Sequence, residues 1–503
     1  MQMVGGEMPS FTEDRPSAGG VLLGYLTEQV PDGAEVLVAG PHDAALIDAL
    51  AARATVTCLL RSQPDAIGLE SRGVRVLCGS LAKVTDESYD VVVALDGLER
   101  LCSVEGPQLD WVESLRALHR LLRPGGTLLL AVENELGVHK LVDPSSSTAS
   151  QADSAWRPLG EFDTKPGNPG RLAGRLAAEG LAVDWLGAAW PVPHEPTLIA
   201  TPNALQDGPA DALAAVTAGA AGRAYAEKSV LSDPRRLAAA AVRGGLGPEL
   251  ASAWLVVAHR APRPAAALSL PPVLIGDGPV VELAPGRDGV WTRRVLHEVP
   301  GRDLSALNGP LPRGRLLEEL LLAACLRHDL PIVRRLLTGW TSAHPGAAAD
   351  NVVVHEDNYT VPSFSVLDPS VPPQTDVIRR FAQTLIGGGY AHPWPAAVDV
   401  PTLTSILHAA AGLPGDDVEA GEEPPLPDSR REHEEQIRAL RRQLADATTR
   451  AQWFERELGR RDSELRKARM QIAAFSGSVS FRVAKLGVGV ARKARNRLRK
   501  GLS

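Results

Sequence analysis

Cysteine is scarce in this chain of 503 residues, and none of its four cysteines has the paired spacing of a metal site or a disulfide framework. Two of them, Cys58 and Cys78, lie in apolar, strand-like runs, where cysteine usually serves as a small buried side chain. The other two are Cys102 and Cys325. The chain also lacks an N-terminal signal pattern and any run of about 18 apolar residues that could span a membrane. We therefore expect a reducing, cytoplasmic location.

Acidic residues slightly outnumber basic ones, with 60 Asp and Glu against 53 Lys and Arg and a formal net charge of -7. This balance excludes a general nucleic-acid binder, and we predict no specific nucleic-acid partner. Basic residues gather at the C-terminal end, because residues 476–503 contain Arg and Lys but no acidic residue. This basic composition predicts that the C-terminal end binds an anionic partner.

One stretch, residues 118–134, organises the first part of the chain. Leucines recur at helical spacing up to Leu122, and Arg123-Pro124-Gly125-Gly126 then interrupts the helix. The residue before proline is disfavoured in a helix, and glycine accepts backbone angles that other residues avoid. Residues 127–132 follow as an apolar run of strand length. This stretch therefore predicts a helix that turns directly into a buried strand.

Strand-like and helix-like segments alternate upstream of this stretch. The strand-like runs are residues 35–39, 55–60, 74–78 and 89–95. Residues 44–52 form an alanine-rich helix with Asp43 as a suitable N-cap. Such alternation predicts a parallel sheet covered on both faces. Ligands of such sheets bind beyond the carboxyl ends of the strands, here near Gly40, Leu60 and Leu95.

The helix, Arg-Pro-Gly-Gly and strand of residues 118–134 resemble the segment leading into the fifth strand of class I S-adenosylmethionine (SAM) dependent methyltransferases. Residues 89–99 resemble the fourth strand of that family, which opens with an aromatic residue and Asp and is followed by Leu-Glu. Residues 171–201 resemble its closing helix and last two antiparallel strands. The resemblance covers about residues 20 to 203. It implies a Rossmann-like, seven-stranded α/β methyltransferase domain over residues 19–205, with SAM as cofactor.

The expected cofactor loop departs from the family pattern D-x-G-x-G-x-G, because it reads Val-Ala-Gly-Pro-His-Asp-Ala. The acid that normally accepts the ribose hydroxyls is missing at Leu60-Arg61, and the usual Gly-Asp after the third strand reads Gly79-Ser80. The resemblance implies these cofactor contacts: Gly40, His42, Asp43, Ser80, Asp96 and Glu99. For Asp96 and Glu99 the alternative is a helix N-terminus, where carboxylates are favoured by the helix dipole.

The catalytic candidates are three polar residues at the positions expected for acceptor-side loops: Glu133, Asn134 and His194. His194 would act as the acceptor base, and the alternative is a structural or exposed histidine in a proline-rich loop. Methyl transfer needs little beyond holding donor and acceptor in line, so an altered cofactor loop threatens activity directly.

Residues 206–414 predict an α+β domain, with paired strands at residues 280–283 and 290–296. Asn351 and Asp368, each beside a short strand, resemble the magnesium ligands of protein-kinase-like phosphotransferases. The position of the catalytic aspartate holds Gly346, so the resemblance implies a pseudokinase. The alternative is an unrelated α+β domain.

Residues 1–18 are expected to be flexible, and residues 415–429 form an acidic, proline-rich linker. In residues 430–476, apolar residues recur by alternating threes and fours, and only Arg461 interrupts the series. This predicts a coiled coil that makes the protein an oligomer, and the alternative is a single helix packed on its own domain. Residues 477–503 predict a basic amphipathic helix on an anionic membrane surface, with nucleic-acid binding or a disordered end as alternatives.

This order of segments resembles the bifunctional methyltransferase-kinases that terminate O-antigen polysaccharide chains at the inner membrane. The resemblance implies a SAM-dependent methyltransferase on the inner face of the cell membrane that acts on a glycan or related acceptor. The alternative is a non-catalytic scaffold that binds glycan-synthesis proteins while its coiled coil sets the oligomer number.

Overall fold

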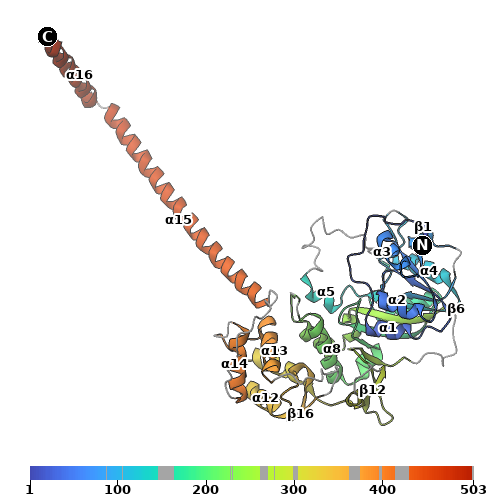
Figure 1. Cartoon of the computed structure of the whole chain (residues 1–503). Coiled ribbons are helices and arrows are strands. Elements are labelled where there is room, and N and C mark those ends of the chain that lie inside the picture. The colour runs from blue at the N-terminus through green and yellow to red at the C-terminus, as the bar shows by residue number, and fades with distance from the viewer. Residues whose placement is uncertain are drawn as a thin grey trace. The chain divides into compact units, whose positions relative to one another are not determined.

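The structure is a computed structural model, and it describes residues 1–85, 88–104, 106–144, 164–226, 228, 230–260, 270–276, 278–297, 304–361, 374–395, 399–413, 430–477 and 479–500. The chain divides into two compact units, residues 1–431 and 432–503. Figure 1 labels the main helices and strands. The predicted linker, residues 415–429, and the proposed ligand Asp368 lie outside the described residues.

A large sheet forms the centre of the first unit, and six of its strands run in parallel in the order β1-β4-β3-β2-β5-β6. They are β1 (Gln2–Gly5), β2 (Glu35–Ala39), β3 (Thr55–Leu60), β4 (Arg75–Gly79), β5 (Tyr89–Ala94) and β6 (Leu122–Glu133). The predicted strands are confirmed, and the Pro-Gly-Gly segment belongs to β6 itself.

Helices cover both faces of this parallel sheet, as predicted. Along β2, Leu37 and Ala39 belong to one buried cluster, whereas Val36 and Val38 belong to the other. This alternation follows from the two-residue period of a strand whose faces are both buried. The helices are α1 (Val21–Thr27), α2 (Ala44–Ala51), α3 (Gln63–Glu70), α4 (Trp111–Leu121), α5 (Val138–Val142) and α6 (Pro169–Ala178).

The sheet continues past residue 205, where the first domain was expected to end. β9 (Ala253–His259) lies between β6 and β7 (Ala182–Trp190) and is antiparallel to both. All seven residues of β9 are buried, so its sequence lacks the polar alternation of a half-exposed strand. Further antiparallel strands extend this side: β8 (Leu198–Ala200), β10 (Val273–Gly276), β11 (Val280–Pro285), β12 (Trp291–His297) and β13 (Gly309–Pro310).

The helices after β8 also pack on this larger core, and not on a separate domain. They are α7 (Pro202–Asp207), α8 (Ala210–Ala224), α9 (Pro234–Arg243) and α10 (Gly247–Leu250). The predicted strands at residues 280–283 and 290–296 are present as β11 and β12, but they belong to the large sheet. A domain boundary at residue 205 would therefore divide one sheet and one core.

A smaller core begins near residue 315. Its three-stranded sheet contains β14 (Arg315–Leu316), β15 (Val353–His355) and β16 (Asn358–Thr360). Its helices are α11 (Leu317–Leu326), α12 (Leu330–Ala343), α13 (Gln374–Gly387) and α14 (Val400–Ala411). Asn351 is buried at the end of a short 3₁₀ helix, and the described residues contain no cluster of three His, Cys, Asp or Glu side chains suited to a metal ion.

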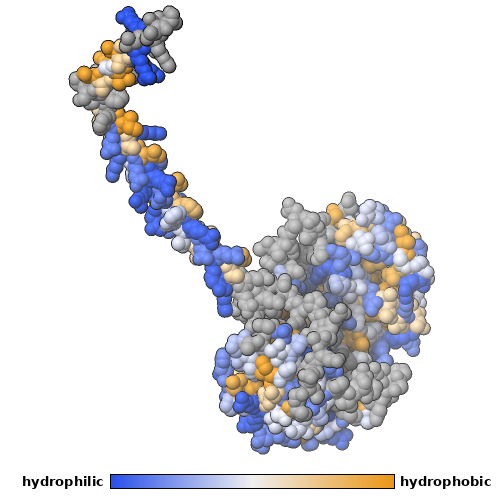
Figure 2. All heavy atoms as spheres, turned by 60° about the vertical axis from the view of Figure 1, so that its left-hand side comes forward, coloured by the Kyte–Doolittle hydropathy of each residue, from blue (hydrophilic) through white to orange (hydrophobic). Residues whose placement is uncertain are grey.

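The described residues of the second unit form two helices, α15 (Arg430–Gly477), which begins two residues before the unit, and α16 (Val479–Lys500). The predicted long helix is thus present, while its pairing with another chain stays a prediction. Apolar side chains recur along α15 (Figure 2), and those of Leu440, Leu444 and Leu458 are each more than 60% exposed. Within the described residues, no helix combines the length and apolar composition needed to cross a membrane.

Candidate functional site

The candidate site lies where the strand order of the parallel sheet reverses, between β2 and β5. The chain passes from β2 to β3 and β4 on one side, and then returns to β5 on the other side. Open parallel sheets bind ligands at the carboxyl ends of the strands at such a point. Gly40 follows β2 with φ of +89°, and a Cβ built there would lie 3.5 Å from Oδ2 of Asp96, just beyond β5. The structure therefore brings Gly40 and Asp96 together, as the sequence predicts.

His42 joins the two strand ends through its ring. The backbone N–H of Leu95 donates to Nε2 of His42 over 3.1 Å, so Nδ1 carries the proton and donates to the carbonyl of Gly40 over 3.0 Å. Burial lowers the pKa of His42 to about 4, which keeps the ring neutral at pH 7. Both ring nitrogens of His42 thus bond to the backbone.

Two other predicted cofactor contacts have local structural roles. Asp43 caps α2, because its Oδ1 accepts from the backbone N–H of Ala45 over 3.3 Å. Ser80 is fully buried, and its backbone N–H donates to the carbonyl of Gly5 over 2.9 Å. The hydroxyl of Ser80 has no hydrogen-bond partner among the described residues.

The N-terminal segment, residues 1–18, crosses the carboxyl ends of three strands, although a flexible segment was expected. β1 pairs with β4, and the N–H of Met8 donates to the carbonyl of Arg61 beyond β3 over 2.8 Å. Beyond β2, the N–H of Ala18 donates to the carbonyl of Pro41 over 3.3 Å. Most of these contacts use backbone groups, so the polar sequence of the segment gives little sign of them.

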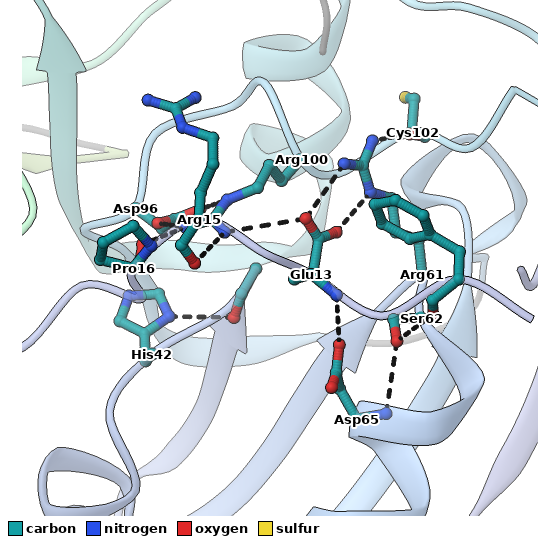
Figure 3. Close-up of polar contacts among 12 residues, drawn as sticks. Glu13, Arg15, Pro16, His42, Arg61, Ser62, Asp65, Asp96, Arg100 and Cys102 are labelled. Carbon is teal, nitrogen blue, oxygen red and sulfur yellow. Dashed lines mark hydrogen bonds and ion pairs between the residues drawn. The ribbon is translucent and has the colours of Figure 1, made fainter. Parts of the chain in front are cut away.

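Glu13 is the central side chain of this segment (Figure 3). Its carboxylate accepts from Nε of Arg61 over 2.7 Å and lies 3.7 Å from Nη1 of Arg100. The side chains of Glu13, Arg61 and Arg100 are only 8%, 2% and 4% exposed. Arg61 also donates to the carbonyl of Cys102 over 2.9 Å. Glu13 therefore supplies negative charge to two buried arginines, and Asp96 also pairs with one of them, Arg100.

The carboxylate of Asp96 is bonded to Arg100 (Figure 3). It accepts from Nε of Arg100 over 2.7 Å and also pairs with Nη2 of the same side chain. Arg100 in turn donates to the carbonyls of Arg15 and Pro16 over 3.2 and 2.9 Å. Burial raises the pKa of Asp96 to about 7, although the guanidinium of Arg100 opposes this shift.

Glu133, the last residue of β6, is surrounded by cationic groups. It accepts from Nη2 of Arg15 over 3.2 Å, lies 2.6 Å from Nζ of Lys140, and bonds to Nε2 of His139 over 3.2 Å. Burial by itself would raise the pKa of Glu133, but the His139 bond and the charges of Lys140 and Arg15 hold it well below its usual range. Glu133 is therefore an ionised carboxylate at neutral pH.

The remaining predicted residues divide into structural and cavity-lining groups. Asn134 is structural, because its amide donates to the carbonyls of Glu249 and Ala251 over 2.6 and 2.8 Å. His194 borders the site, and burial lowers its pKa to about 4, with the nearby charges of Lys228 and Arg15 acting in the same direction. An imidazole with so low a pKa is a weak base at neutral pH. Glu99 forms an ion pair with Lys165 over 2.8 Å.

A cavity of about 40 Å³ remains at the switch point. Asp96, Glu99, Glu133 and His194 line it together with Arg15 of the N-terminal segment. This volume holds a few water molecules, whereas ligand pockets usually measure about 300 to 1,000 Å³. SAM does not fit in this conformation, because Glu13 and Arg15 fill the edge and Arg61 stands where a ribose-binding acid is expected.

Sequence reasoning missed the roles of Glu13, Arg15 and Arg100. Arg61 was recognised as a departure from the family pattern, but its partner lies 48 residues earlier in the chain. One signal was available, because a cation at the end of a buried strand requires a compensating acid. No local pattern indicates which acid that is.

No protein-family model and no curated protein matches this chain. Among solved structures, a SAM-dependent methyltransferase from Mesorhizobium loti is 14% identical, with a TM-score of 0.27 over 47% of this chain and 96% of that chain. One from Geobacter sulfurreducens, solved with S-adenosylhomocysteine, is 15% identical, with a TM-score of 0.26 over 50% and 95%. The 1,6-didemethyltoxoflavin-N1-methyltransferase of Burkholderia thailandensis is 16% identical, with a TM-score of 0.25 over 48% and 76%. Scores at this level carry no argument about function.

Proposed function

We propose that the larger core of the first unit is a methyltransferase domain of the class I SAM-dependent superfamily, with SAM bound at the carboxyl edge of its parallel strands. The supporting observation is the placement of Gly40, Asp96 and Glu133 around the switch point of the sheet. The turn from α4 into β6 through Arg-Pro-Gly-Gly, which carries the resemblance to this superfamily, adds local support.

Binding of SAM in this proposal requires residues 13–18 to leave the edge of the sheet. Their present position leaves only about 40 Å³ at the site and places the Glu13 carboxylate between Arg61 and Arg100. The contacts that hold the segment include backbone hydrogen bonds, the ion pairs of Glu13, the ion pair of Arg15 with Glu133, and the hydrogen bonds from Arg100 to the carbonyls of Arg15 and Pro16. Displacement of the segment would open the edge of the sheet beyond β2, near Gly40, where the missing side chain lets a ligand approach the backbone closely.

The second candidate is a non-catalytic scaffold that binds polysaccharide-synthesis proteins. Glu13 favours it, because a buried ion pair at the expected ribose position stabilises a closed site. The low pKa of His194 and the structural hydrogen bonds of Asn134 point in the same direction. In this candidate the fold supplies binding surfaces, and the second unit sets the number of copies.

Calorimetric titration of SAM and S-adenosylhomocysteine into the full chain separates the two candidates. If the methyltransferase proposal is correct, both ligands bind, and Glu13→Gln binds them more tightly because the N-terminal segment is released more easily. Glu249→Gln, which removes an exposed carboxylate but keeps the backbone carbonyl that Asn134 bonds, should match the wild type. Absence of binding to both the wild type and Glu13→Gln, with circular dichroism showing folded proteins, would leave only the scaffold.

For the second unit we propose self-association through residues 430–476 and attachment to an anionic membrane surface through residues 477–503. The exposed apolar residues of α15 support the first, because they repeat at coiled-coil spacing. Membrane attachment is supported by Val483, Leu486 and Val490, which are exposed among basic residues. A glycan acceptor and a location at the inner face of the cell membrane rest on the resemblance in segment order. A pseudokinase role for the smaller core rests on the resemblance of Asn351 and Asp368 to magnesium ligands of kinases.

A further inference from the structure

A second cavity, of about 960 Å³, lies in the first unit away from the switch point. The start of α8 and Trp291 of β12 form one side of it. The other sides are formed by the chain around β14, by the helices α11 and α12, and by the turn between β15 and β16. A cavity of this size can hold a small organic molecule. None of the residues predicted to be catalytic, cofactor-binding or metal-binding lines it.

Four arginines line this cavity: Arg313, Arg315, Arg327 and Arg335. Among the residues that the structure describes, only Arg315 of these four has an ion pair, which its Nη2 makes with Glu319. The Nε of Arg315 is buried and has no hydrogen-bond acceptor among the described residues.

The backbone holds these arginines in position. Gly314 has φ of +125°, and a Cβ built there would lie 2.4 Å from the carbonyl oxygen of Val354. The chain between Arg313 and Arg315 is therefore pressed tightly against β15. On α12, Arg335 lies three residues after Ile332, and both line the cavity from one face of the helix.

The rest of the lining combines apolar and acidic groups. Trp291, Ile332 and Leu336 supply apolar surface. Asp211 is occupied by an ion pair with Arg243 over 3.0 Å, which leaves Asp207 and Glu356 as the other carboxylates of the rim. Carboxylates accept hydrogen bonds from hydroxyl groups, and an indole ring packs against the flat face of a sugar or another ring.

We propose that this cavity binds a phosphorylated small molecule that also carries hydroxyl groups, of the sugar-phosphate class. The guanidinium groups of Arg313, Arg315 and Arg335 would contact the phosphate, since Arg matches its geometry with two parallel hydrogen bonds. Trp291 would pack on the ring, and Asp207 or Glu356 would accept from its hydroxyls. The proposal is independent of SAM binding, because it uses different residues.

Calorimetric titration of the full chain with inorganic phosphate and with glucose 1-phosphate tests this proposal. Both should bind, and glucose should bind far more weakly than glucose 1-phosphate. Arg335→Gln should weaken the binding of both phosphate compounds about tenfold, the usual effect of losing one charge-assisted hydrogen bond. Arg334→Gln is the matched control, because Arg334 is exposed on the same helix but does not line the cavity.

Several results would overturn the proposal. Failure of both phosphate compounds to bind at millimolar concentration would exclude a phosphate site. Equal losses in Arg334→Gln and Arg335→Gln would show attraction by surface charge alone. Arg313→Gln tests the same cavity from a different element, so unchanged affinity in that variant would also contradict the assignment. Glucose 1-phosphate binding no tighter than inorganic phosphate would refute the part of the proposal that concerns the sugar.

Discussion

Replacing Glu13 by Gln should release the N-terminal segment from the edge of the sheet. The amide can still accept one hydrogen bond, but it no longer neutralises Arg61, whose side chain is 2% exposed. Breaking a buried ion pair by removing one partner costs about 3 to 5 kcal/mol. Arg100 keeps its pair with Asp96, so we expect a value near the lower end, about 3 kcal/mol.

Hydrogen exchange measured by mass spectrometry detects this loss of stability in individual segments of the chain. A loss of about 3 kcal/mol corresponds to roughly a hundredfold rise in exchange. The rise should appear at the amides of Met8, Ala18 and Asp43, whose hydrogen bonds form between the segment and the strand ends. Amides of β5 and β6 should keep their protection, because their partners lie within the sheet. Glu249→Gln should leave all of these rates unchanged.

Two results would refute this reasoning. Exchange in residues 8–18 that stays within a factor of about two of the wild type would show that the Glu13 charge does not hold the segment. An equal rise throughout β5 and β6 would show instead that the ion pair stabilises the whole core. A further variant, Glu13→Leu with Arg61→Met, should recover most of the protection, since apolar pairs often replace buried ion pairs without loss.

Two further predictions concern the site and the second unit. Folding lowers the pKa of His42 from 6.5 to about 4. The contribution of the neutral His42 ring to the free energy of unfolding is therefore complete above pH 6.5, and up to about 3 kcal/mol of it is lost as the pH falls toward 4. Urea midpoints across this range should therefore depend less on pH in His42→Gln than in the wild type, and identical profiles would contradict the assignment. The chain of residues 1–431, one compact unit, should sediment as a monomer and fail to bind anionic liposomes. The full chain should sediment as an oligomer and bind these liposomes. A truncated chain that stays oligomeric or liposome-bound would refute the assignments for the second unit.

Local patterns in the sequence predicted the elements that form over short distances. The Arg-Pro-Gly-Gly segment predicted the change from α4 to β6, and Asp43 predicted the start of α2. The apolar repeat after residue 430 predicted α15. These features follow from backbone preferences and periodicity, which need no information about distant residues.

The positions of Gly40 and Asp96 could also be predicted, because the carboxyl ends of adjacent parallel strands meet at one edge. The strand β9 could not be predicted, because its buried sequence has no alternation of polar and apolar residues. Its partner strands also lie about 60 to 130 residues away in the chain. The domain boundary expected at residue 205 was therefore too early.

The sequence by itself determined the α/β class of the first unit, the edge of the sheet where its candidate site lies, and the long helix of the second. The tertiary structure alone decided that Glu13 occupies that edge, that Asp96 pairs with Arg100, and that four arginines line a separate cavity. The physical reason is the range of the interactions involved. Helix caps and strand periods are local, whereas a buried charge selects its partner from whichever residues the fold brings within a few ångströms.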